Sequence, residues 1–206
     1  MTTIRPDGLD TRTALLAAAR AELTEHGRAA IGLRAVARRA GVSHAAPTYF
    51  FQDRAGMLTA VATQGFHELG EALRAVDTVA PQHRLAALGR AYIDFGLTEP
   101  ALFDLMFRPG DLRTADPDLA AARQASIEPL VDAVAAQEAP RDRGADRTPA
   151  MALVSWALVH GLVALARDGA LQEVAGAPAG DDGSALAGAL ADLFADRVIS
   201  RGGESR

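Results

Sequence analysis

The sequence predicts an all-α protein of about nine helices, and three observations lead to that prediction. Ala, Leu and Arg are frequent among the 206 residues, and all three are good helix formers. Val and Ile never alternate with polar residues over a strand-length run, so no half-buried strand is expected. Glycine and proline interrupt segments in which apolar residues recur at helical spacing.

The first two helices are predicted over residues 11–26 and 33–40. In the first, apolar residues follow helical spacing up to Leu23, and Gly27 stands where a C-terminal cap is wanted. In the second, an apolar stripe runs from Leu33 to Ala40 at positions i, i+3, i+4 and i+7. Gly41 should end it, because glycine adopts a left-handed conformation without a steric penalty.

A short third helix is expected over residues 44–50, with Ser43 as its N-cap. Pro47 would lie in its first turns, where a missing N–H costs about one hydrogen bond at most. A longer helix should follow over residues 54–76, with apolar residues again at helical spacing.

The middle of the chain continues the helical pattern. Helices are predicted over residues 82–97, 100–107 and 117–138, with a turn at residues 108–111. Pro129 should kink or break the last of these helices. The charged segment 139–147, which contains proline and glycine, is expected to be a loop.

Residues 149–166 form an uncharged run of eighteen residues. A short membrane span would fit the length, but the run is rich in alanine and holds Ser155, His160 and Gly161. We therefore interpret it as a helix buried on nearly all sides. Residues 176–183 are predicted to be a loop, and Ser184 to cap a last amphipathic helix that ends at about residue 200.

Composition excludes several kinds of chemistry. The chain has no cysteine and no lysine, so disulfides, thiolate nucleophiles, cysteine-based zinc sites and lysine-dependent phosphate loops are ruled out. No metal-ligand cluster or glycine-rich phosphate loop is seen, so we expect neither a cofactor nor an enzyme. The N-terminal residues lack the apolar stretch of a signal peptide, which favours the cytoplasm.

The charge is unevenly distributed. The net charge is −5, but residues 1–54 hold eight Arg against five Asp and Glu, whereas residues 55–206 hold thirteen against twenty-one. The first part is therefore +3 and the second −8. A basic head on an acidic body is weak support for binding a polyanion.

The segment from Leu33 to Tyr49 has the layout of a helix-turn-helix. Ala37 and Ala40 are small enough for close helix packing, Gly41 makes the turn, and Val42 can fill the core beneath it. The second helix of such a motif enters the major groove of DNA. Any two-helix corner in a helical protein would show a similar pattern, so the motif alone leaves that reading open.

Residues 27–66 resemble the DNA-binding head of the TetR/AcrR family of transcriptional regulators. The matching residues are Leu33-Arg34-x-Val36-Ala37, Ala40-Gly41-Val42-Ser43, Ala46-Pro47, Phe51-x-Asp53-Arg54 and Leu58. Trp156, His160 and Gly161 resemble the Trp-x-x-x-His-Gly signature of one branch of that family. The chain departs from the family pattern at Thr48, Phe50 and Arg54, where the family usually has Tyr, His or Tyr, and often Lys.

The resemblance implies a DNA-binding domain at residues 1–54. Ser43, Tyr49 and Arg54 would contact phosphates, and Arg34 is a weaker candidate for the same role. His44 and Ala45 would face base edges, while Thr48 could meet a base or a phosphate. A solvated surface residue is the alternative for each position.

The resemblance also implies that residues 55–206 bind a small, mostly apolar effector and form a homodimer on a near-palindromic operator. The ligand candidates are the larger side chains of this part, although a plain core role fits each of them: Tyr92, Phe95, Phe103, Met106, Phe107, Trp156 and His160. The dimer candidates lie on the last two long helices: Leu158, Leu162, Leu186, Leu190, Leu193 and Phe194. Dimerisation would set the two heads 34–36 Å apart, one turn of DNA.

The leading hypothesis is a ligand-released repressor. An activator, or a regulator without a small-molecule effector, fits the sequence as well. A helical membrane-associated or scaffold protein is a third possibility, which depends only on the uncharged run.

Overall fold

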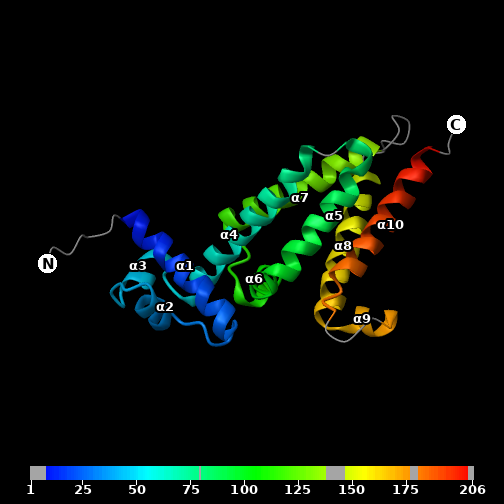
Figure 1. Cartoon of the computed structure of the whole chain (residues 1–206). Coiled ribbons are helices and arrows are strands. Elements are labelled where there is room, and N and C mark those ends of the chain that lie inside the picture. Colours follow the sequence, from blue (N-terminus) through cyan, green and yellow to red (C-terminus); the bar gives the residue numbers. More distant parts are fainter. Residues whose placement is uncertain (1–7, 79, 138–146, 177–180, 204–206) are drawn as a thin grey trace. The chain divides into compact units, whose positions relative to one another are not determined.

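The computed structural model describes residues 8–78, 80–137, 147–176 and 181–203, and these residues contain no strand (Figure 1). The all-α prediction is confirmed. The described elements, with two 3-10 turns (η) among ten α-helices, are α1 (Gly8–His26), α2 (Leu33–Arg39), α3 (Ala46–Phe51), α4 (Arg54–Arg74), η1 (Ala75–Thr78), α5 (Pro81–Thr98), α6 (Pro100–Met106), η2 (Pro109–Asp111), α7 (Pro117–Gln137), α8 (Arg147–Arg167), α9 (Ala170–Ala175) and α10 (Ser184–Gly203).

Two predicted N-caps are wrong. Helix α3 begins only at Ala46, its N-cap residue is Ala45, and no side chain caps it. Helix α10 begins at Ser184 itself, whose N–H donates to the Asp182 carboxylate, so Asp182 is the side chain that satisfies this helix end. In both cases the serine lies close to the helix start, but the backbone places a neighbouring residue in the cap position.

The short helix α9 was not predicted. Two residues in left-handed conformation, Gly169 and Gly176, bound it, and Gln172 donates to the carbonyls of Ala166 and Asp181. These tertiary hydrogen bonds hold a segment that is too short to be stable as a helix by itself. Most of the loop predicted over residues 139–147 lies outside the described residues, as do residues 177–180.

Helix α7 continues through Pro129, so the predicted break is wrong. Proline has no N–H, which leaves the carbonyl of Ala125, four residues earlier, without its helical donor. The guanidinium of Arg74, at the end of α4, donates to that carbonyl at 3.5 Å. A side chain from another helix therefore takes the place of the missing backbone group.

The chain divides into two compact units. One comprises residues up to His67 together with Pro100–Arg123, and the other comprises Glu68–Glu99 and Gln124–Arg206. Helices α4 and α7 each contribute to both units. The expected domain division at residues 54 and 55 stays a prediction.

In the first unit, α1, α2 and α3 pack together around small and branched side chains (Figure 1). Val36 and Ala37 of α2 are fully buried, as is Ala19 of α1. Arg39 fastens α2 to α1, because it donates to Glu22 at 2.7 Å and to both carboxylate oxygens of Glu25. The hydrogen bond from Arg39 lowers the pKa of Glu25 below its usual range.

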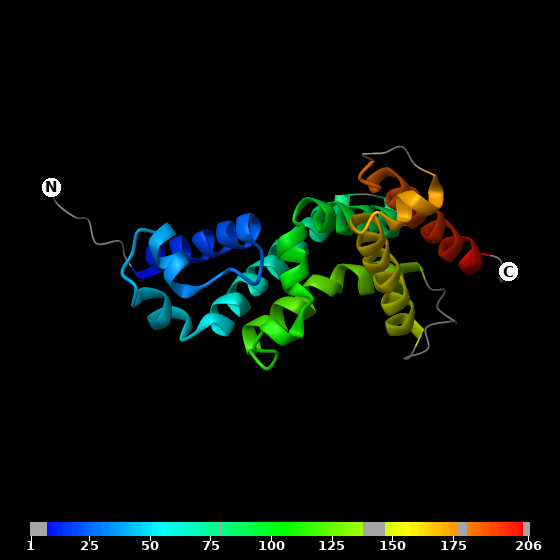
Figure 2. The same ribbon diagram turned by 90° about the horizontal axis from the view of Figure 1, so that it is seen from below.

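In the second unit, α8 and α10 lie beside α5 (Figure 2). One part of its core joins these three helices and α7 through buried apolar side chains: Leu85, Ala86, Val134, Ala152 and Ala195. Gly89 of α5 permits a close approach, since an added Cβ would lie 3.3 Å from the Cβ of Ala191 on α10.

Helix α8 is covered on one side only. Its buried residues, among them Val159 and Val163, face the unit's own core, whereas Leu153, Val154 and Leu165 are exposed. The expectation of a helix buried on nearly all sides is therefore wrong for the single chain. By length and composition this helix could cross a membrane, with 33% of the relevant window buried, which is weak evidence for a span.

Candidate nucleic-acid interface

Helices α2 and α3 form the predicted two-helix corner. Gly41 has a φ of 67°, and the N–H of Val42 donates to the carbonyl of Ala37 at 3.1 Å, which closes α2. The next turn is closed by the Ala46 N–H, which donates to the carbonyl of Ser43 at 3.0 Å. The left-handed residue is thus a glycine, where a side chain would be strained.

One surface of this corner holds most of the predicted contact residues. Ser43, His44, Ala45, Thr48 and Tyr49 are all exposed, while Pro47 and Phe51 of the same segment are buried. The ring of Tyr49 is exposed to 82% and makes an edge contact with Phe50. Two buried side chains therefore orient α3 so that the other residues face outward.

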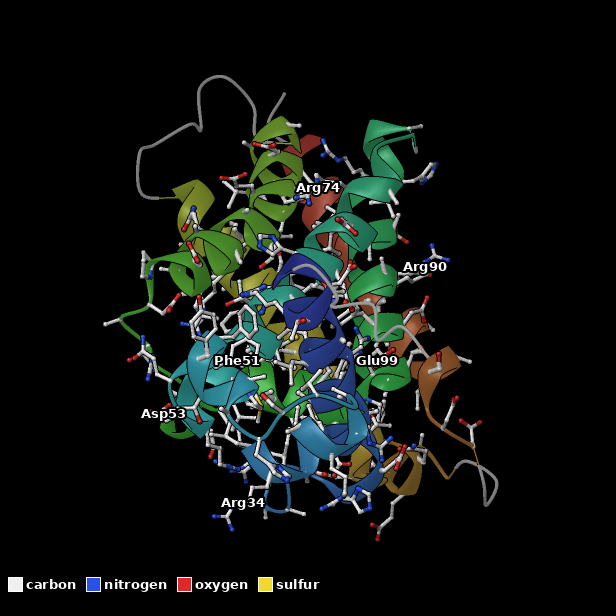
Figure 3. All side chains as sticks on the ribbon, turned by 90° about the vertical axis from the view of Figure 1, so that its left-hand side faces the viewer. Arg34, Phe51, Asp53, Arg74, Arg90 and Glu99 are labelled. Atoms are coloured by element: carbon white, nitrogen blue, oxygen red, sulfur yellow. The ribbon has the colours of Figure 1, made fainter. Side chains whose placement is uncertain are left out.

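Arg34 also reaches outward, from α2. Its side chain points away from the ribbon in Figure 3, and it is exposed. Among the described residues, neither Arg34 nor Arg38, one helical turn later, has an ion-pair partner. Arg38 was missed by the sequence reasoning, although its spacing of four residues from Arg34 is a usable signal.

Other arginines of the first unit are engaged within the protein. Arg39 binds two glutamates of α1, and Arg28 pairs with Asp111. The guanidinium of Arg12 lies 5.7 Å from the centre of the Phe51 ring, a cation–π contact. Arg34 and Arg38 therefore differ from these three in having no such contact within the described part of the chain.

Arg54 has partners inside the protein as well. It donates to the carbonyl of Arg28 at 2.6 Å and to that of Ile31 at 3.0 Å, and its Nη1 lies 3.6 Å from Asp111. These bonds join the start of α4 to the loop between α1 and α2. Its expected contact with a phosphate stays a prediction, and its internal bonds give it a positioning role.

The junction of α3 and α4 is a tight turn at Gln52. This residue has a φ of 70° and a ψ of −55°, and the N–H of Asp53 donates to the carbonyl of Phe51 at 2.9 Å. Such a γ-turn with positive φ at its centre is rare and strained. The strain lies directly behind the exposed face of α3, where it fixes the direction in which the chain leaves that helix.

Asp53 and Gly56 complete this junction. Asp53 accepts the N–H of Gly56 at 2.8 Å, as an N-terminal cap of α4, and also accepts from Arg113 at 2.9 Å. The Gly56 N–H and the Arg113 guanidinium hold the pKa of Asp53 below its usual range. Gly56 has no room for a side chain, because an added Cβ would overlap the Phe51 carbonyl oxygen.

Three of the predicted ligand residues meet in the second unit. The Trp156 indole donates to the hydroxyl of Tyr92 at 3.1 Å, and this hydroxyl lies 2.9 Å from Nδ1 of His160. Burial raises the pKa of Tyr92, which is 5% exposed, and lowers that of His160. Both groups are therefore neutral near pH 7, so the tyrosine hydroxyl can donate to the imidazole.

The remaining ligand candidates lie on α5, on α6 or directly after α6. Phe103 and Phe107 stack at 4.8 Å in the first unit, where Phe107 also meets Phe66 edge-on. Met106 of the same helix is fully buried and packs near Gly65 of α4. Phe95, on α5, is half-buried. The described residues contain no group of acidic or histidine side chains suited to a metal ion.

The predicted dimer residues are covered to different extents. Leu193 is exposed, and Leu158, Leu186, Leu190 and Phe194 are half-buried. Leu162 is buried within its own chain, so it packs α8 onto its neighbours. The dimer role of all six residues stays a prediction.

Comparison with known proteins relates both parts of the chain to one family. Residues 15–61 match the family described as bacterial regulatory proteins, tetR family, and residues 85–193 match the tetracyclin repressor-like C-terminal domain. The predicted branch with the Trp-x-x-x-His-Gly signature stays a prediction. No curated protein matches the chain.

Solved structures show the same fold over almost the whole chain. A protein of unknown function from Rhodococcus sp. RHA1 is 33% identical, with a TM-score of 0.74, over 93% of this chain and 94% of its own. A TetR-family transcriptional regulator from Streptomyces coelicolor is 22% identical, with a TM-score of 0.66, over 95% and 98%. The TetR-like regulator LfrR from Mycobacterium smegmatis, solved in complex with proflavine, is 22% identical, with a TM-score of 0.57, over 94% and 96%.

Proposed function

This chain belongs to the TetR family of transcriptional regulators, and from that premise we propose that it is a repressor that a small ligand releases from its operator. As a regulator it binds DNA through its N-terminal helices. The proposal adds that the operator is a near-palindrome, that two copies bind it together, and that the protein works in the cytoplasm.

The exposed face of residues 43–49 is the observation that carries the DNA contact. His44 and Ala45 would face base edges, and Thr48 could meet a base or a phosphate. Ser43, Tyr49 and Arg34 would contact phosphates. We add Arg38 to this phosphate group, because it is exposed on the same helix as Arg34 and has no ion-pair partner among the described residues.

A second copy of the chain would cover the apolar side of α8 and α10. Leu153, Val154 and Leu165 on α8 and Leu193 on α10 are large apolar side chains left exposed in the single chain. Pairing about a two-fold axis would bury them in a four-helix interface. It would also bring two DNA-binding domains together, one for each half-site of the operator. In this interface the exposed residues Leu153, Val154 and Leu165 of α8 would contact the second copy, in place of Leu162, which is buried within its own chain.

The ligand would be small and mostly apolar, because the predicted binding residues are mainly aromatic. Tyr92, Trp156 and His160 would provide polar contacts within this apolar setting. The regulator from Mycobacterium smegmatis, solved with proflavine, is an example from the same fold of a small molecule bound. Ligand would favour a conformation that no longer fits the operator, in proportion to its differential affinity for the two states.

The proposal is tested by selection of bound sequences from a random duplex library, with the mass of the protein in solution measured alongside. An enriched near-palindrome together with a dimer mass is the expected result. A dimer that enriches nothing would count against the DNA contact assigned to residues 43–49. An operator whose affinity no apolar ligand changes would favour a regulator without effector, and activation of a reporter gene would favour an activator.

Individual contacts are then separated by two substitutions. His44→Ala should relax the preference at one base position, by about tenfold, whereas Tyr49→Phe should weaken binding to all sequences alike. His67→Ala serves as the control, because it changes an exposed histidine on α4 that lies outside the proposed DNA-contact segment, residues 43–49. A His44→Ala protein that keeps the full preference at every position would remove this residue from base recognition.

A further inference from the structure

The connection between α6 and α7, residues 107–116, contacts the helix-turn-helix at both of its ends. Arg28 lies in the loop by which the chain enters α2, and Asp53 and Arg54 lie where it leaves α3. All three residues meet the connection through charged side chains. The connection belongs to the same compact unit as these residues.

Asp111 joins the entry and the exit directly. Its Oδ2 accepts from Arg28, and its Oδ1 lies 3.6 Å from Nη1 of Arg54. The carboxylate is only 18% exposed, so it is less screened by solvent than a surface ion pair. Arg54 in turn donates to the backbone carbonyl of Arg28, so that Arg28, Asp111 and Arg54 are joined in a closed ring of contacts.

Arg113 holds the exit at a second point. Its guanidinium donates to Asp53 at 2.9 Å, and a Cβ added at Gly56 would lie 3.1 Å from it. Its backbone N–H donates to the hydroxyl of Thr59 at 2.9 Å, one turn further along α4. Side chain and backbone of one residue therefore fasten the connection to the first turns of α4.

The contacts of Asp111 and Arg113 support the strained turn at Gln52. A backbone in a rarely populated conformation persists only when its surroundings hold it there. Asp53 and Arg54, the two residues that follow Gln52, are the ones that Arg113 and Asp111 contact. The orientation of α3 thus depends on residues that lie about sixty positions later in the sequence.

We propose that Asp111 and Arg113 are positioning residues for DNA recognition, which hold both ends of the helix-turn-helix from the α6–α7 connection. Neither residue needs to touch DNA for this role. The inference rests on the proposed DNA-binding function and adds that the DNA-reading unit includes residues beyond the head.

Asp111→Asn is a sharp test, because long-range electrostatics and a positioning role predict opposite changes in DNA affinity. Removal of a negative charge from a DNA-binding protein should strengthen binding if only long-range electrostatics matters. Loss of a positioning contact should weaken it, by about tenfold, the size of coupling found between residues that share a network. Asp111→Glu keeps the carboxylate and should retain most of the affinity.

Asp116→Asn is the matched control. Asp116 lies in the same connection, but its carboxylate accepts the N–H groups of Asp118 and Leu119 at the start of α7. Asparagine caps helices about as well as aspartate, so the control loses the same charge without a local defect. It should bind the selected duplex as well as the wild type or slightly better.

Arg113 is tested by a double-mutant cycle with Asp53. Arg113→Gln should weaken binding more than Arg108→Gln, which removes the same charge from an exposed residue of the same connection. Combined with Asp53→Asn, which keeps the cap on Gly56, it should cost little more than either change alone, because the pair is already broken. All affinities are measured well below the lowest melting temperature of the set.

Binding of the selected duplex by the wild type separates the positioning role of Asp111 and Arg113 from DNA binding itself. If the wild type binds the selected duplex and Asp111→Asn binds it as well as Asp116→Asn does, the positioning role is overturned and the DNA-binding function stands. The same holds if Arg113→Gln and Arg108→Gln are equal. If the wild type binds no duplex, the proposed function falls and this inference falls with it.

Discussion

At the scale of single residues, the junction behind α3 combines a strained residue with one that must be glycine. Gln52 adopts a positive φ, and the carbonyl of Phe51 lies over Gly56. A backbone atom cannot give way as a flexible side chain can. Position 56 is therefore among the least tolerant of the first unit.

Gly56→Ala should destabilise the protein by about 2 kcal/mol or more, because the methyl group would overlap a backbone oxygen and force the turn to move. Gly110→Ala is the control, since nothing lies within 4 Å of a Cβ added there. It should change the free energy of unfolding by about 0.5 kcal/mol at most. Urea denaturation measures both, and equal midpoints for the two variants would contradict the crowding at Gly56.

His160 should make the stability pH-dependent. Its pKa is lowered by burial, so the unfolded chain binds this proton more readily than the folded chain. The resulting stability is present above the ordinary histidine pKa of about 6.5 and is lost as the pH falls through the folded value. Protonation would also remove the acceptor that faces the Tyr92 hydroxyl.

His160→Gln should therefore flatten the loss of stability below about pH 6.5, as measured by thermal denaturation at a series of pH values. His67→Gln changes an exposed histidine and is the comparison. Parallel pH profiles for the wild type and His160→Gln would mean that the buried imidazole contributes nothing to acid sensitivity.

At the scale of elements, the ends of the helices follow the sequence more closely than their starts. The glycines at 27 and 41, both at positive φ, end α1 and α2 where the sequence predicts. Ser43 and Ser184 look like N-caps in sequence, but they miss that position by two residues and one residue. A backbone hydrogen bond from Ala46 to Ser43 sets the turn before α3, and the Asp182 carboxylate accepts the Ser184 N–H at the start of α10. Composition identifies a helix start within a few residues, and tertiary contacts decide the rest.

The roles of Ser43 and Asp53 can be separated by stability. Ser43→Ala should leave the melting temperature almost unchanged, because its side chain caps no helix. Asp53→Ala should lower it, since the carboxylate caps Gly56 and binds Arg113. Thermal denaturation of both variants decides this, and a larger loss for Ser43→Ala would restore Ser43 as the cap of α3.

At the scale of the whole molecule, the apolar pattern predicts most helices and the two-helix corner. The family resemblance points to the exposed contact candidates, which are Ser43, His44, Ala45, Thr48 and Tyr49. The charged contacts of Asp111 and Arg113 were not predicted, because they join residues about sixty to eighty positions apart, and no local pattern encodes such a pair. The uncharged run of α8 was interpreted as buried in its own chain, since hydrophobicity does not say which chain covers a helix.

The dimer can be tested by a charge on its expected interface. Leu193→Asp should convert a dimer to a monomer and reduce operator binding, because a carboxylate would be buried against apolar side chains. Val174→Asp on α9, where the side chain is 91% exposed, should leave the mass unchanged. Sedimentation equilibrium distinguishes the two, and an unchanged dimer in Leu193→Asp would place the interface elsewhere.

The proline in α7 has one more consequence. The donor for the Ala125 carbonyl comes from Arg74, fifty-one residues earlier, and not from α7 itself. The end of α4 and the middle of α7 are thereby made dependent on each other. If either segment moved away, the Ala125 carbonyl would lose its donor to water. Helix α7 would then be less stable at the point where Pro129 already removes a backbone hydrogen bond.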